Sequence, residues 1–125
     1  MLELILGGVR RPLARVLCLG AHSDDIEIGC GGAVLALADR YPGLIVDWVV
    51  FSGNQLRHAE ARASAEAFLT TAGAREIDLY DFRDGYFPFE GALVKDRFEA
   101  LKSRPQPDLI FTHRRDDRHQ DHRLI

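Results

Sequence analysis

Short apolar runs alternate with longer segments of helical periodicity along this chain. The apolar runs are rich in β-branched or aromatic side chains, which is typical of buried strands. They span residues 15–21, 44–51, 77–80 and 109–112. The segments between them have the composition and spacing of helices that pack on a sheet through one face. They span residues 32–40, 55–72 and 93–102.

Strands that alternate with helices of this length predict an α/β fold. The expected architecture is Rossmann-like, a mostly parallel sheet with helices on both faces. Pro42-Gly43, Gly73, Pro105 and Pro107 separate the elements, because proline and glycine interrupt helices. Ligands of such sheets bind beyond the carboxyl ends of the strands, so we expect chemistry in the loops that follow them.

Composition restricts the classes of protein that remain. The 125 residues suffice for one domain, residues 1–125, but not for two. A formal net charge of −3 offers no basic surplus for a phosphate backbone, so no nucleic acid partner is expected. No apolar run is long enough for a membrane span, and the N-terminus lacks a signal-peptide pattern, so a cytoplasmic location is expected. Cys18 and Cys30 do not form the framework of a disulfide-rich secreted protein.

The first chemically distinctive segment, residues 22–27, follows the first predicted strand. The adjacent carboxylates of Asp24 and Asp25 repel each other unless a cation or strong donors offset their charge. By themselves they are more typical of a solvated turn or a helix cap. His22 changes this balance, because His22 and Asp25 could chelate one ion on a tight turn while Asp24 points toward a water.

The second segment is His119-Gln120-Asp121-His122, which follows the last predicted strand. His119 and His122 are three residues apart and could face one way on a helical turn, with Asp121 available to hold an imidazole in one tautomer. Without its histidines the surrounding run would be read as a solvated charged loop. His113 is interpreted as a loop or strand-end residue. Because both segments follow parallel strands, we expect them to meet at one rim of the sheet.

These two segments resemble the PIG-L/LmbE-like family of metal-dependent N-deacetylases. The family pattern Ala-His-Pro-Asp-Asp-x-Glu matches residues 21–27 except that Ser23 replaces proline, and His-Pro-Asp-His matches residues 119–122 except that Gln120 replaces proline. Both changes affect loop rigidity rather than chemistry. Since related chains continue well beyond the second motif, the resemblance implies the N-terminal portion of the family domain, apparently lacking its C-terminal part.

The resemblance also implies roles for individual residues. The expected ligands of Zn²⁺, or of Fe²⁺ or another divalent metal, are His22, Asp25 and His122. Asp24 is the expected general base, His119 the group that stabilises the oxyanion or protonates the departing amine, and Asp121 the residue that orients an imidazole. The candidates for contacts with sugar hydroxyls are Arg57, Glu60 and Asp84. An equally weighted alternative is that Arg57 and Glu60 form only a surface pair on a helix.

The implied activity is metal-dependent removal of an N-acyl (acetyl) group from a small amino sugar or N-acetylglucosaminyl conjugate. One alternative is a non-catalytic metal-binding or partner-binding module, because a chain without the C-terminal half could leave the pocket too open. A more distant alternative is a metal-dependent phosphoesterase. The chain ends three residues after His122, too soon for a further helix and strand, so a fragment or association with another copy is expected.

Overall fold

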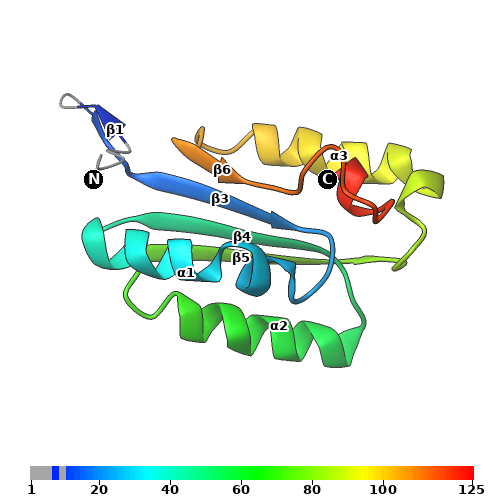
Figure 1. Ribbon diagram of the computed structural model, residues 1–125, viewed down its shortest axis with the longest axis horizontal. Helices are drawn as coiled ribbons and strands as arrows, with labels where there is room; N and C mark the ends of the chain where they lie inside the picture. Colours follow the sequence, from blue (N-terminus) through cyan, green and yellow to red (C-terminus); the bar gives the residue numbers. More distant parts are fainter. Residues whose placement is uncertain (1–6, 9–10) are drawn as a thin grey trace.

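The computed structural model describes residues 7–8 and 11–125 and shows a parallel four-stranded sheet with helices on both faces (Figure 1). The strand order is β5-β4-β3-β6, and every neighbouring pair is parallel. These strands are β3 (Arg15–Gly20), β4 (Ile45–Ser52), β5 (Ala74–Phe82) and β6 (Leu109–Phe111). A separate antiparallel pair, which the sequence did not predict, consists of β1 (Gly7–Gly8) and β2 (Arg11–Pro12). The predicted Rossmann-like α/β class is confirmed.

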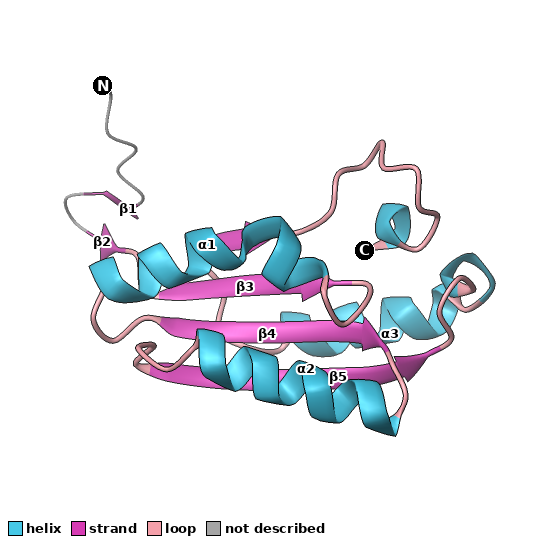
Figure 2. Cartoon of the chain, turned by 60° about the horizontal axis from the view of Figure 1, so that its bottom comes forward, coloured by secondary structure: helices cyan, strands magenta, loops and turns pink. Residues whose placement is uncertain are grey.

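Helices cover the two faces of the sheet unequally. The helical elements are α1 (Asp25–Arg40), α2 (Gln55–Phe68), α3 (Gly91–Lys102) and the short 3₁₀ turns η1 (Phe87–Phe89) and η2 (His122–Leu124). Figure 2 shows α1 and α2 on one side of the sheet and α3 on the other. The strand β4 is buried on both faces, since Trp48 packs in the α1/α2 core and Phe51 packs with Val94 of α3. A strand covered in this way reads as a continuous apolar run.

Asp47 interrupts that apolar run, and the structure gives the reason. Its carboxylate is buried and accepts two hydrogen bonds of 2.7 Å from the guanidinium of Arg15 on β3. The hydrogen bond with Asp47 raises the pKa of Arg15 although burial opposes this. The two residues lie on adjacent strands, so each charge is compensated by the other in a buried part of the sheet.

The largest difference from the predicted elements is the start of α1. The helix begins at Asp25 rather than near residue 32, because the packing of Ile26 and Val34 into the core outweighs the low helix propensity of the glycines between them. A Cβ on Gly31 would lie 2.6 Å from the ring of Phe68, so this glycine lets α1 approach α2. The other differences are small: α2 ends at Phe68 rather than Ala72, and β5 extends two to three residues beyond both predicted ends.

Candidate metal and active site

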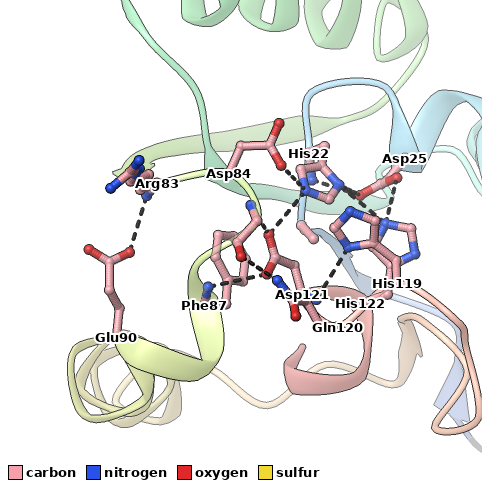
Figure 3. Close-up of polar contacts among 12 residues, drawn as sticks. His22, Asp25, Arg83, Asp84, Phe87, Glu90, His119, Gln120, Asp121 and His122 are labelled. Carbon is pink, nitrogen blue, oxygen red and sulfur yellow. Dashed lines mark hydrogen bonds and ion pairs between the residues drawn. The ribbon is translucent and has the colours of Figure 1, made fainter.

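Both motifs lie at the carboxyl ends of parallel strands and meet there. Residues 21–24 connect β3 to α1, and residues 112–121 lead from β6 to η2. Because β3 and β6 are neighbours, their carboxyl ends bring His22 and His122 together (Figure 3). The topology thus supplies the common rim that the sequence predicted.

Three side chains converge as a ligand set would. The Nδ1 atom of His22 lies 3.2 Å from Nε2 of His122 and 3.3 Å from Oδ2 of Asp25, and Nε2 of His122 lies 3.4 Å from Oδ1 of Asp25. Zinc–ligand bonds of about 2.0–2.1 Å in a tetrahedron place ligand atoms about 3.3 Å apart. Each pair of these side chains has atoms at about that spacing, with Asp25 presenting Oδ2 to His22 and Oδ1 to His122. The three side chains are 14–19% exposed, so the donors are held within the protein.

Further imidazole and carboxylate groups surround this set. The ring of His119 lies 4.7 Å from the rings of both His22 and His122, and Asp84 places Oδ1 3.1 Å from Nε2 of His22. Donor atoms of His22, His119 and His122 all lie within 4.8 Å of one another, as do donor atoms of Asp25, His113 and His122. This mixture of nitrogen and oxygen donors fits zinc or ferrous iron better than the all-oxygen sites of magnesium or calcium.

Charge in the site is organised around His22 and Asp25. The hydrogen bond with Asp25 raises the pKa of His22 to about 9, although burial opposes this, and the charge of Asp84 adds to it. Burial would raise the pKa of Asp25, but the imidazoles of His113 and His22, each 3.3 Å from Oδ2, outweigh it and hold this pKa well below its usual range. The metal-free site is therefore a protonated imidazole beside an ionised carboxylate, and a bound cation would replace that proton.

This pair predicts a pH-dependent stability of the metal-free chain. Because the pKa of His22 rises from 6.5 to about 9 on folding, its stabilising contribution is complete below about pH 6.5 and is lost as pH approaches 9. Wild type should therefore be more stable than His22→Ala at about pH 6, and this advantage in the free energy of unfolding should shrink by about 2–3 kcal/mol above pH 9. Denaturant unfolding in the presence of a chelator measures this difference. A stability difference between wild type and His22→Ala that does not change with pH would contradict a raised pKa of His22 in the folded chain.

A cavity of about 660 Å³ opens beside the ligand set. Its lining residues are His22, Ser23, Asp24, Ser52, Gly53, Asn54, Arg57, Asp81, Phe82, Arg83, Asp84 and His119. Asp24 occupies the N-cap position of α1, yet within the described residues its side chain makes no capping hydrogen bond. Its exposed carboxylate is thus available to a molecule in the cavity. The volume is in the range of small-molecule sites.

The sugar-contact candidates separate in the structure. Arg57 and Asp84 line the cavity, whereas Glu60 is not one of its lining residues. Glu60 Oε2 accepts a hydrogen bond of 3.0 Å from Nη1 of Arg57, and both side chains are more than half exposed. The surface pair that the sequence allowed as an alternative is therefore present, while Arg57 also faces the cavity.

Asp121 contacts an imidazole, that of His22, and also binds the backbone of a distant loop. Its fully buried carboxylate accepts hydrogen bonds from the backbone N–H groups of Gly85, at 2.6 Å, and Phe87, at 3.1 Å. The nearest imidazole atom is Nε2 of His22, at 3.4 Å, whereas His119 Nδ1 accepts the backbone N–H of Asp121. Asp121 thus ties the second motif to the loop that carries Asp84 (Figure 3).

Gln120, which stands where the family has proline, joins the same loop. Its side-chain amide donates a hydrogen bond to the carbonyl oxygen of Gly85. The residue therefore restrains the second motif by a tertiary contact, where proline would restrain it through its own backbone ring.

Sequence reasoning missed the contacts of two residues near the second motif. His113 Nε2 accepts the backbone N–H of Ala21 at 3.0 Å and lies 3.3 Å from Oδ2 of Asp25, and its ring stacks on His122 at 4.0 Å. Asp117 Oδ1 accepts the backbone N–H of His119 at 2.8 Å. The sequence indicated these two residues only by their position. Both follow β6, and β6 pairs with β3, which leads into the first motif.

The fold and the site define a class: a parallel α/β protein with histidine and aspartate donors gathered at the carboxyl rim of the sheet. The PIG-L family, described as GlcNAc-PI de-N-acetylase, matches residues 17–125. The chain belongs to this family, as the two motifs predicted.

Individual relatives agree with the family assignment. The chain is 29% identical over 122 residues to "Uncharacterized deacetylase YaiS" of Escherichia coli, a match that covers 88% of this chain and 63% of the relative. It is 30% identical over 129 residues to diacetylchitobiose deacetylase of Thermococcus kodakarensis, covering 87% of this chain and 45% of the relative. The chain therefore spans about half to two-thirds of the length of these relatives.

A solved structure supports the fold independently. The conserved protein TT1542 from Thermus thermophilus superposes with a TM-score of 0.63 at 24% identity, covering 87% of this chain and 50% of that one. At this identity the likeness concerns the fold alone. Among the described residues, no helix has the length and apolar character needed to cross a membrane.

Proposed function

We propose that residues 1–125 form a single domain that acts as a metal-dependent N-deacetylase, with an N-acetylated amino sugar or N-acetylglucosaminyl conjugate as substrate. The observation that carries this proposal is the convergence of His22, Asp25 and His122, in which each pair of side chains approaches within 3.4 Å, beside a cavity. These three residues would hold the metal, for which we favour Zn²⁺ over Fe²⁺. The family and the deacetylase relatives support the reaction class.

The residues around the ligand set have the chemistry that amide hydrolysis needs. A bound divalent ion supplies Lewis acidity at the amide carbonyl and acidifies a water molecule. Asp24, exposed in the cavity and outside the ligand set, would take the proton of the attacking water. His119 lines the same cavity next to His22 and would stabilise the oxyanion or protonate the departing amine. Asp121 would orient His22 and hold the Asp84 loop in place.

The cavity supports a small sugar as substrate. Its volume of about 660 Å³ accommodates a ligand of one or two rings, and its polar lining offers partners for hydroxyl groups. Arg57 and Asp84 are the proposed contacts, and Glu60 would contribute by holding Arg57 through their hydrogen bond. The relative named diacetylchitobiose deacetylase motivates the choice of test substrates.

Replacing Asp84 by alanine tests its proposed role in binding the sugar. We expect KM to rise by about tenfold and kcat to fall less, because a hydrogen bond made equally in ground and transition states affects binding alone. Steady-state kinetics measure both constants, and Asp84→Asn, which keeps an acceptor oxygen, should retain part of the affinity. An unaltered KM in Asp84→Ala would remove Asp84 from the substrate site.

The proposal as a whole is tested by acetate release. The zinc-loaded chain is incubated with N-acetylglucosamine and with diacetylchitobiose, and a chelated sample is the control. Metal-dependent release of acetate is expected from at least one of them. Stoichiometric zinc binding without release from either would favour the non-catalytic metal-binding module, and hydrolysis of phosphate esters instead would favour a phosphoesterase.

A further inference from the structure

We propose that Asp117 is a positioning residue: its carboxylate selects the tautomer of His122 that leaves Nε2 free to bind a metal. This inference rests on the proposed metal site but not on any substrate. Sequence alone placed Asp117 within a solvated charged run, and the motif itself begins two residues later, at His119.

The ring of His122 packs against two other imidazole rings. It stacks on His113 at 4.0 Å with an interplanar angle of 13°, and on His119 at 4.7 Å with an angle of 30°. In this orientation Nε2 faces the first motif, 3.2 Å from Nδ1 of His22 and 3.4 Å from Oδ1 of Asp25. The other nitrogen, Nδ1, lies 3.3 Å from Oδ1 of Asp117. Nε2 of His122 therefore faces His22 and the carboxylate of Asp25, whereas Nδ1 faces the carboxylate of Asp117.

A neutral imidazole carries one proton, so these two carboxylates compete for it. A proton on Nε2 would point at Asp25 and occupy the lone pair that a metal needs. A proton on Nδ1 finds its nearest charged acceptor in Asp117. Histidines that bind metals commonly donate their second N–H to a carboxylate for this reason. Asp117 thus favours the tautomer of His122 that can bind a metal.

The surroundings of Nδ1 of His122 make the contact with Asp117 important for this nitrogen. Among the residues that the structure describes, the buried Nδ1 of His122 has no hydrogen-bond partner, and the carboxylate of Asp117 lies 3.3 Å from it. The position of that carboxylate is fixed separately, because Oδ1 of Asp117 accepts the backbone N–H of His119 at 2.8 Å. One oxygen therefore contacts both histidines of the second motif.

The neighbouring aspartate supplies a matched control. The side chain of Asp116 is 72% exposed and pairs with Arg114 at 2.8 Å, whereas the side chain of Asp117 is 35% exposed and lies 3.3 Å from His122. Removal of either carboxylate changes the net charge of the loop equally. Only removal of Asp117 changes the surroundings of His122.

The test compares Asp117→Ala, Asp117→Asn and Asp116→Ala in the full 125-residue chain. Competition with a chromophoric chelator measures Zn²⁺ affinity, and ¹⁵N–¹H correlation spectra of the metal-free chain at alkaline pH report the tautomer of His122. We expect Asp117→Ala to bind zinc about 10- to 100-fold more weakly than Asp116→Ala and to shift His122 toward the Nε2–H form. Asp117→Asn, which keeps an acceptor oxygen, should lose less affinity.

Two results would overturn the inference. One is a wild-type chain in which metal-free His122 carries its proton on Nε2, a measurement that needs no variant to fold. The other is equal zinc affinity in Asp117→Asn, Asp117→Ala and Asp116→Ala. Neither readout involves turnover, so a chain that binds zinc in this way but releases no acetate would contradict the proposed deacetylase activity and leave the role of Asp117 intact.

Discussion

Replacement of Asp24 by asparagine is expected to lower kcat for acetate release by about 10²- to 10⁴-fold while zinc content stays unchanged. Asparagine has nearly the same shape but cannot accept a proton from water. Asp24 is exposed at the N-cap of α1 and lines the cavity, and it is not one of the three converging donors. Its loss should therefore remove the base without disturbing the ligand set. Steady-state kinetics together with elemental analysis of the same sample measure both effects.

Asp81 provides the control for this prediction. Its carboxylate also lines the cavity and is highly exposed, and it lies 3.4 Å from Nδ1 of His58 on α2. Asp81→Asn removes one negative charge from the same cavity, so it should change kcat by less than about threefold. If Asp24→Asn kept wild-type kcat, the general base would lie elsewhere, and if it lost zinc, Asp24 would be a ligand.

His122→Ala is expected to abolish metal binding and, with it, acetate release. The substitution removes one of three converging ligands and also the ring that stacks on His113 and on His119. His22→Ala should have the same effect, because Nδ1 of His22 lies 3.2 Å from Nε2 of His122. Elemental analysis of purified wild type should find zinc or iron near one equivalent, and both variants should contain almost none.

His58→Ala is the matched control for the loss of an imidazole. His58 lies on α2, where Nε2 is 3.1 Å from the carbonyl oxygen of Tyr80, away from the ligand set. This variant should retain its metal. If only one of the two ligand variants lost the metal, the two motifs would not share one ion, and a metal-free wild type after zinc addition would refute the site altogether.

Local sequence signals were sufficient for the fold class and for the positions of the motifs. The strand β4 could be predicted because burial on both faces leaves a continuous apolar run, in which Asp47 is the exception. The pairing of Asp47 with Arg15 could not be predicted, since it depends on how β3 and β4 lie in register. The start of α1 was misplaced because glycine propensity is local, whereas the packing of Ile26 and Gly31 is tertiary.

By itself, the sequence determined the α/β class, the family and the two loops that hold the candidate ligands. These features follow from short-range periodicity and from residue types at fixed spacing. Only the tertiary structure decided which atoms face each other. His113 accepts the N–H of Ala21, 92 residues away in sequence, and Asp121 accepts the N–H of Gly85, 36 residues away. Asp117 faces His122. The physical reason is that such contacts depend on strand order and loop path, which bring distant residues within hydrogen-bond range and leave no periodic trace in the chain.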